Sequence, residues 1–378
     1  MRHTVTSCRQ GSWPSRPQPN AVVLHVPLSR FSLTALTALG LCGLAIVDAG
    51  AQRLEALWYL RGEESAQAFL EHADQITIVA PQVYTMDSTG TIRGQVDPRV
   101  IETARAKGVK LMPLVMNPGF DQPTIHRVLT DPTARAQALR SLAALCRANR
   151  FDGIQFDFEN FHVSDKDAFT SFTREAVDSV HRAGCQLSAA VVPRLGEDAG
   201  PNSYDRWIYD NWRAAFDYKA LADTLDFISY MTYAQHTGGS PPGPVAGYPW
   251  MKACLEYLLS LGVRRSNISL GIAGYSDWWY PSYDDTSGAR LRGSDISYTQ
   301  LKAILDSAGV KPVWDDTQKS PYATWEVKGV FRHAWLEDSR AFMAKLELVR
   351  TYRLRGYSVW VLGGEDEAVW TRLPRAAR

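Results

Sequence analysis

One short segment, residues 151–160, carries the side chains best suited to acid–base chemistry. Gln155, Asp157 and Glu159 alternate there with apolar residues, as in a β-strand with one polar and one apolar face. Two carboxylates in line are costly to bury unless they serve a purpose, and carboxylates close together push their pKa values apart. The spacing therefore predicts Glu159 as a proton donor and Asp157 as its ionised partner.

A structural polar ladder and a divalent-metal site are the alternative interpretations of this segment. A metal site would need further carboxylates or histidines at the ends of neighbouring strands. The strand ends carry instead Tyr84, Asn117, Arg194, Tyr233 and Trp360. We therefore expect neither a metal ion nor another cofactor.

The strand with these residues belongs to a repeated strand–helix pattern. Amphipathic helices separate most of eight strand candidates, and two helices start with a capping Asp followed by Pro, at Asp97 and Asp131. Repeated βα units indicate parallel strands with right-handed crossovers, and eight units predict the α/β fold of a (β/α)8 TIM barrel. The strand candidates are 57–60, 75–81, 110–116, 153–158, 186–192, 226–232, 268–273 and 357–362.

The barrel fold places the carboxylates at its active end. Catalytic residues of such barrels lie at the carboxyl ends of the strands, where Glu159 closes the fourth strand. A doubly wound sheet is the alternative fold, but no glycine-rich phosphate loop follows the first strand. The extra length predicts a small α+β insertion between strands seven and eight, at about 279–335, with a helix near 298–307.

Three strands together resemble glycoside hydrolase family 18, the chitinase-like barrels. The family's D-G-x-D-x-D-x-E motif is matched from Asp152 to Glu159 at every defined position but one. The sixth strand, 228–233, is similar to the family's M-x-Y-D element, with Tyr233 as its tyrosine. The eighth, 356–360, is similar to the strand that places a tryptophan under the bound sugar. The resemblance covers nearly all of 54–372.

The resemblance implies retaining hydrolysis assisted by the substrate, an exception to the two-carboxylate mechanism. Glu159 would protonate the glycosidic oxygen, Asp157 would hold the 2-acetamido N–H, and Tyr233 would bind the acetamido carbonyl. The substrate would be a polysaccharide or oligosaccharide with β-linked N-acetylglucosamine, either chitin-like or peptidoglycan. The substrate-binding residues would be Trp360 as the floor of the sugar site, with Gln155, Met231, Gln235 and Tyr84.

Two positions depart from the family pattern. Gln155 replaces the first inward Asp, and Ala234 replaces the Asp after Tyr233. Gln155 can hydrogen-bond Asp157 but cannot share a proton with it, so we expect an altered pH profile or substrate preference. A non-catalytic, lectin-like barrel is the alternative function, and the presence of Glu159 argues against it.

The first 51 residues have the order of a secretory signal. Four arginines and no acidic residue precede an apolar run at 31–47, and Ala49-Gly50-Ala51 offers a cleavage site before Gln52. We expect an exported protein, secreted or periplasmic, with residues 52–378 as the mature catalytic barrel. An uncleaved membrane anchor is the alternative for the apolar run.

Composition restricts the partners of the chain. It has 378 residues and a net charge of +1, from 41 basic and 40 acidic side chains, so no basic excess points to nucleic acid. Membrane contact is expected only through the N-terminal segment, and we expect a monomer. The 12 Trp and 16 Tyr suit either a core or a sugar cleft, in which flat rings stack on pyranose faces.

The sequence allows two roles for some residues and assigns others to packing. Trp58 and Tyr59 are expected in the core, whereas Trp278 and Trp279 suit a sugar platform and insertion packing equally. Arg194 and His236 suit the cleft or its solvated rim equally. Of the three cysteines after the signal, Cys146 and Cys254 fall in helix patterns and are expected as small buried apolar residues, with at most one disulfide in the chain.

Overall fold

The computed structural model describes residues 54–375, apart from 285–287. The predicted signal segment, 1–51, lies outside the described residues. None of the helices within the described ranges is long and apolar enough to cross a membrane.

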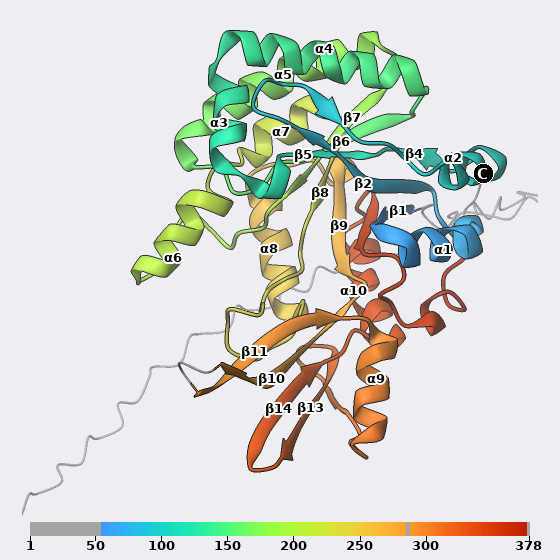
Figure 1. Ribbon diagram of the computed structural model, residues 1–378, viewed down its shortest axis with the longest axis vertical. Coiled ribbons are helices and arrows are strands. Elements are labelled where there is room, and N and C mark those ends of the chain that lie inside the picture. Colours follow the sequence, from blue (N-terminus) through green and yellow to red (C-terminus); the bar gives the residue numbers. More distant parts are fainter. Residues whose placement is uncertain (1–53, 285–287, 376–378) are drawn as a thin grey trace, which may run out of the picture. The chain divides into compact units, whose positions relative to one another are not determined.

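Eight parallel strand positions form a closed barrel, as the sequence predicted (Figure 1). Strand β1 pairs in parallel with both β2 and β15, which closes the sheet. The third position is split in two, because Met112 and Pro113 separate β4 from β5. The barrel strands are β1 (Glu55–Leu60), β2 (Ile78–Met86), β4 (Lys110–Leu111), β5 (Leu114–Met116), β6 (Gly153–Asp157), β7 (Gln186–Val191), β8 (Phe227–Tyr230), β9 (Ile268–Ala273) and β15 (Gly356–Trp360).

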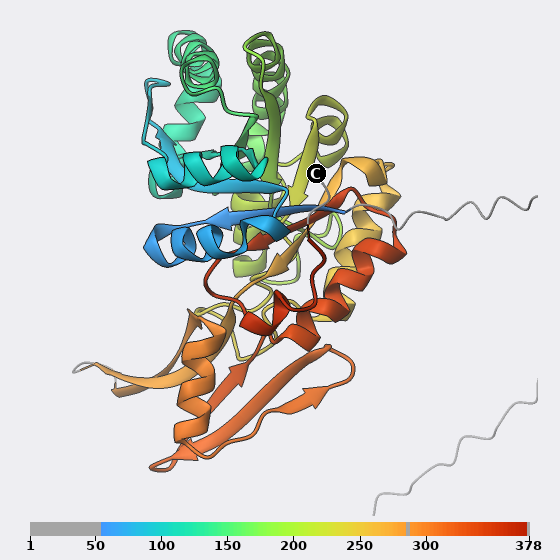
Figure 2. The same cartoon turned by 90° about the vertical axis from the view of Figure 1, so that its right-hand side faces the viewer.

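Helices connect the strands and cover the outside of the barrel (Figure 2). The two Asp-Pro starts are present: Asp97 accepts a hydrogen bond from the backbone N–H of Arg99, and Asp131 from those of Thr133 and Ala134. The helices are α1 (Gly62–His72), α2 (Pro98–Lys107), α3 (Gln122–Thr130), α4 (Pro132–Asn149), α5 (Lys166–Arg182), α6 (Ser203–Ile208), α7 (Tyr218–Thr224), α8 (Tyr248–Ser260) and α10 (Ser339–Thr351).

The apolar residues form two layers, one outside and one inside the sheet. Phe156 and Phe158 of the β6 segment stack at 4.8 Å between ring centroids and belong to the outer layer. Trp58 lies in the same layer and stacks on Trp370 at 4.4 Å, as expected for a core residue. The smaller inner layer includes Tyr59, whose alternation with Trp58 points it into the barrel.

Between β9 and α10 the described chain forms a five-stranded antiparallel sheet and helix α9, drawn in orange in Figure 1. Its own small core includes Leu301, Leu305 and Trp325. Helix α9 (Tyr298–Ser307) covers the range predicted for a helix. The strands are β10 (Ser276–Asp284), β11 (Gly288–Ile296), β12 (Val313–Asp315), β13 (Ser320–Val327) and β14 (Val330–Trp335); a further two-residue strand, β3 (Ile92–Arg93), pairs with β2.

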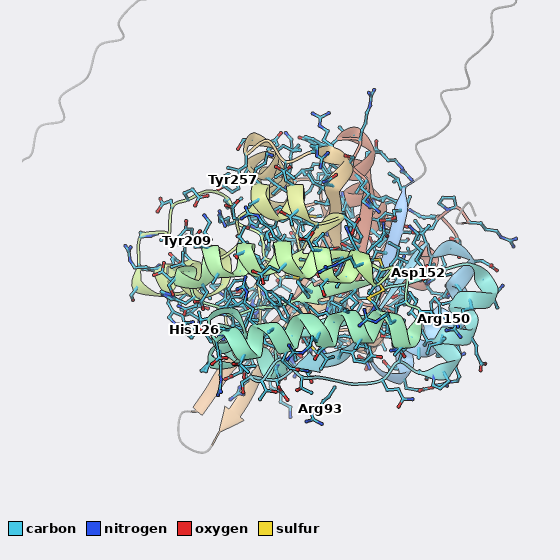
Figure 3. All side chains as sticks on the ribbon, turned by 90° about the horizontal axis from the view of Figure 1, so that it is seen from above. Arg93, His126, Arg150, Asp152, Tyr209 and Tyr257 are labelled. Atoms are coloured by element: carbon cyan, nitrogen blue, oxygen red, sulfur yellow. A yellow bond between two sulfur atoms is a disulfide. The ribbon has the colours of Figure 1, made fainter. Side chains whose placement is uncertain are left out.

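One disulfide joins Cys146, near the end of α4, to Cys185, which immediately precedes β7. Figure 3 shows this bond in yellow near Asp152. Cys146 is buried as expected, and this bond is the one disulfide that the sequence allowed. The sequence could not identify the pair, which the barrel brings to 6.1 Å between Cα atoms, within bonding reach. Cys254 is free and buried, as expected.

Candidate active site

A cleft of about 750 Å³ lies over the carboxyl ends of the barrel strands. Residues from all eight strand positions or from the short segments after them line it, including Tyr59, Gln82, Asp157, Tyr233 and Trp360. It therefore lies where barrel enzymes bind their substrates.

Asp157 and Glu159 lie together in this cleft. Asp157 is the last residue of β6 and only 3% exposed, and burial raises the pKa of its carboxyl. Burial raises the pKa of Glu159 well above its usual range, and the negative charge of Asp157 raises it further. Of the two carboxyls, Glu159 therefore holds a proton more readily, and Asp157 is the more readily ionised.

Asn117 holds the backbone of Glu159 in place. The buried Asn117 amide donates from Nδ2 to the Glu159 carbonyl at 3.0 Å and accepts from the Glu159 N–H at 3.2 Å through Oδ1. Phe158, between the two carboxylates, is fully packed in the outer layer. The acid is thus held by two backbone hydrogen bonds and one apolar anchor.

Gln82 was missed by the sequence analysis, and Tyr84 was wrongly assigned to the cleft. Gln82 Nε2 donates to Asp157 Oδ2 at 3.4 Å. Strict alternation would place Tyr84 on the same face, but a register shift between the two residues pairs Gln82 with Leu114 and Tyr84 with Val115. Tyr84 consequently packs in the outer layer and does not line the cleft.

Gln155 lies one inward step below Asp157 and is fully buried. Its Nε2 donates to Ser188 Oγ at 3.0 Å and to Ser229 Oγ at 3.2 Å. Within the described chain it has no hydrogen bond to Asp157, and it does not line the cleft. It therefore supports the floor beneath the carboxylates, whereas the sequence analysis expected it to contact the substrate.

Tyr233, Met231 and Gln235, which the sequence analysis assigned to the site, all line the cleft. Burial raises the pKa of the Tyr233 hydroxyl well above its usual value, so it remains a hydrogen-bond donor. Gly271 makes room for this ring, since a Cβ there would lie 2.9 Å from Tyr233 Cε1. Gln235 also braces its own loop by accepting from the Gly247 N–H at 2.7 Å.

Trp360, at the end of β15, lines the cleft beside Tyr59, with 5.5 Å between ring centroids. Tyr59 is thus part of both the inner core and the cleft wall, although core packing alone was expected.

A family comparison agrees with this geometry. The model of the glycosyl hydrolases family 18 matches residues 58–365. The chain belongs to glycosyl hydrolases family 18. It is therefore a glycosidase with a chitinase-like (β/α)8 barrel.

Relatives of this family 18 chain carry several names. It is 22% identical to the uncharacterized glycosylase YvbX of Bacillus subtilis, over 85% of this chain and 90% of that protein. It is 27% identical to the cortical fragment-lytic enzyme of the same organism, over 82% of this chain and 70% of that enzyme. The crystal structure of a Chromobacterium violaceum chitinase matches with a TM-score of 0.74 and 25% identity, covering 85% of this chain and 98% of that one.

Other residues singled out from the sequence have packing roles in this family 18 barrel. Arg194 is buried and donates to the backbone carbonyls of Arg213 and Phe216. Trp279 is buried and donates to the Ser240 carbonyl at 3.2 Å, whereas Trp278 stacks on Tyr280. His236 Nδ1 lies 3.0 Å from the Pro241 carbonyl oxygen. None of these four lines the cleft.

The family 18 cleft has one wall that the sequence analysis did not predict. Helix α6 and the π-helical turn after it, Tyr209–Arg213, contribute Tyr204, Trp212 and Arg213. These residues follow β7 without a repeating apolar pattern, so the sequence offered no periodic signal. In the described ranges no group of three or more His, Cys, Asp or Glu could hold a metal ion.

Proposed function

We propose that this glycosidase is an exported enzyme that cleaves β-linked N-acetylglucosamine glycans by substrate-assisted, retaining hydrolysis. The observation that carries the proposal is the cleft itself, in which the Glu159 and Asp157 carboxyls lie together with the Tyr233 hydroxyl and the Trp360 ring, and in which burial and the charge of Asp157 raise the pKa of Glu159. A buried neutral acid next to a carboxylate suits protonation of a leaving group beside a developing positive charge.

In the first step Glu159 gives its proton to the glycosidic oxygen, and the bond from that oxygen to the anomeric carbon breaks. The substrate's own 2-acetamido oxygen attacks the anomeric carbon and forms an oxazolinium ion. Asp157 accepts a hydrogen bond from the acetamido N–H and balances the positive charge, while Tyr233 donates to the acetamido oxygen. Water then attacks the same carbon, the bond from that carbon to the acetamido oxygen breaks and restores the acetamido group, and a proton of the water goes to Glu159.

Two kinds of glycan fit this mechanism, chitin-type oligosaccharides and peptidoglycan. Relatives bear names of both kinds, including a human di-N-acetylchitobiase at 24% identity and the cortical fragment-lytic enzymes. The lectin-like alternative has less support, because the acid, the anion and the tyrosine converge on one cleft.

Export is supported by two independent features. The N-terminal order of charge, apolar run and small residues is typical of a secretory signal, and disulfides such as Cys146–Cys185 persist in oxidising compartments. N-terminal sequencing of the mature protein is expected to start at Gln52. Recovery of the uncleaved chain in the membrane fraction would favour the anchor instead.

The decisive experiment compares the wild type with Glu159→Gln. Release of reducing ends from chitotetraose and from peptidoglycan is measured, with Glu102→Gln, on the exposed face of α2, as the matched control. We expect Glu159→Gln to lower kcat/KM by about 10³-fold, because general acid catalysis contributes roughly 10²–10⁴-fold. Glu159-independent release, or no release from either glycan, would contradict the proposal.

The assisted mechanism has its own test. Matched oligosaccharides that lack the 2-acetamido group should bind without being hydrolysed, because they carry no internal nucleophile. Appreciable turnover of these substrates would show that a protein group or water attacks the anomeric carbon instead.

A further inference from the structure

The wall formed by α6 and the turn after it lies in the cleft beyond the catalytic pair. Tyr204 and Trp212 line the cleft there, and Trp212 makes an edge contact with Phe120 of the opposite loop, at 6.3 Å between ring centroids. Tyr204 is 62% exposed although it is a large aromatic residue. Exposed rings at the mouth of a sugar cleft offer flat apolar surfaces to pyranose rings.

The backbone of this wall is held firmly by a buried arginine. Arg194 Nη1 donates to the Arg213 carbonyl at 2.8 Å, and Arg194 Nη2 pairs with Glu197 at 2.8 Å. Glu197 in turn accepts hydrogen bonds from the hydroxyls of Tyr209 and Tyr257, both labelled in Figure 3. The backbone of Arg213 is therefore held in place before any ligand binds.

Arg213 is one of the residues that line the cleft. Among the described residues its guanidinium makes neither an ion pair nor a side-chain hydrogen bond. Asp205 also lines the cleft, but its carboxylate accepts from Asn202 Nδ2 at 2.7 Å and forms no bridge to Arg213. Within the described residues, the wall thus presents to the cleft the guanidinium-bearing Arg213, without an ion pair, beside two aromatic rings.

We propose that this wall is a sugar subsite that selects N-acetylglucosamine glycans with carboxylate substituents, with Arg213 as the specificity-determining residue. A guanidinium binds a carboxylate through two parallel hydrogen bonds, while Tyr204 and Trp212 contact the sugar faces. The carboxylate belongs either to a lactyl ether on the sugar or to a peptide attached to it. The inference rests on the proposed function and narrows its substrate from neutral chitin to an acidic glycan such as peptidoglycan.

Binding is measured in the Glu159→Gln background, so that no probe is consumed. The probes for calorimetry are a GlcNAc–MurNAc tetrasaccharide with free lactyl carboxylates, its carboxyl-reduced counterpart and chitotetraose. A disaccharide-peptide, in which the lactyl carboxyl is an amide, separates the two sources of carboxylate. We expect the carboxylate tetrasaccharide to bind about tenfold more tightly than its reduced counterpart, and the preference to shrink at high salt.

Substitutions of Arg213 then test the assignment. Arg213→Gln should remove the preference, and Arg213→Lys should keep part of it, because the charge remains and the two-pronged geometry is lost. Arg206→Gln is the matched control, since Arg206 is an exposed arginine of α6 outside the cleft lining. It should retain the full tenfold preference.

Three results would overturn the inference: equal binding of all probes, a preference that survives Arg213→Gln, or an equal loss of affinity for every probe in that variant. The last would mean that Arg213 only supports the wall. Failure of the proposed function is a different result, namely no Glu159-dependent hydrolysis, and the binding comparison remains decisive in that case. A preference for the disaccharide-peptide alone would assign the carboxylate to the peptide.

Discussion

The two carboxyls of the cleft, Asp157 and Glu159, are buried in a way that lowers the stability of the fold. The Asp157 carboxyl accepts one amide hydrogen bond, from Gln82, and is hydrogen-bonded to the Glu159 carboxyl, while Asn117 holds the backbone of Glu159. Neither carboxyl forms an ion pair with a basic side chain in the described residues. Burial without a cation raises both pKa values, and it does so at the expense of the folded state near neutral pH.

The upward direction of these pKa shifts determines how the free energy of unfolding depends on pH. The pKa of Glu159 is higher in the folded protein than in the unfolded chain, so its contribution to stability is fully present below the unfolded pKa and is lost as pH rises through the folded pKa. Glu159→Gln removes the titrating carboxyl and with it this loss of stability at high pH. We expect the variant to be more stable than the wild type by about 1–3 kcal/mol at pH 8 and by much less at pH 4.

Urea unfolding at the two pH values measures this difference through the transition midpoint. A gain in stability that is equal at pH 4 and pH 8 would show that Glu159 titrates normally, and would remove the basis for its assignment as the neutral acid.

At the scale of elements, the sequence predicted strands and helix starts correctly wherever a simple periodic pattern or a capping pair marks them. Alternation identified β6 with its inward Asp157, and the Asp-Pro pairs identified the starts of α2 and α4. The sequence did not predict which side chains reach the cleft where the backbone is locally irregular. The extra residue in β2 turns Tyr84 away from the cleft and leaves Gln82 in it. No periodic pattern in the sequence predicts the cleft wall formed by α6. Cysteine spacing also could not reveal the Cys146–Cys185 pair, which only the closed barrel brings together.

This disulfide constrains two consecutive βα units. It spans 39 residues of sequence, from the end of α4 across β6 and α5 to the start of β7. Closing a loop of this length in the unfolded chain stabilises the fold by about 2–4 kcal/mol. We expect Cys146→Ala/Cys185→Ala to lower the free energy of unfolding by that amount in urea. A reductant should lower the urea midpoint of the wild type but leave that of the double variant unchanged, and equal sensitivity of both would contradict the prediction.

At the scale of the whole molecule, the insertion braces the cleft. Its Trp279 donates to the Ser240 carbonyl, and its Gln318 carbonyl accepts from the Tyr248 N–H at 3.0 Å. Both contacts fall on the segment after β8, which supplies Tyr233 and Gln235 to the site. Part of the chain's high aromatic content thus serves to fasten the insertion to the barrel, while Tyr233 and Trp360 line the cleft.

A buried ion pair makes the second attachment of the insertion. Lys345 of α10 pairs with Glu337, and both contact Ser320 of β13, with the three side chains almost fully inaccessible. Removing one partner of such a pair leaves an uncompensated buried charge, which costs about 3–5 kcal/mol, whereas replacing both partners is far less costly. The Lys345–Glu337 pair should therefore couple the unfolding of the insertion to that of the barrel.

We expect Lys345→Met to lower the free energy of unfolding by about 3–5 kcal/mol, and Lys345→Met/Glu337→Gln to recover most of that loss, because the amide can still accept from Ser320. The matched control is Lys302→Met in α9, whose exposed pair with Asp306 contributes roughly 0.5 kcal/mol. Urea unfolding followed by tryptophan fluorescence measures all three. If Lys345→Met destabilises the protein no more than Lys302→Met does, the buried pair does not join the insertion to the barrel.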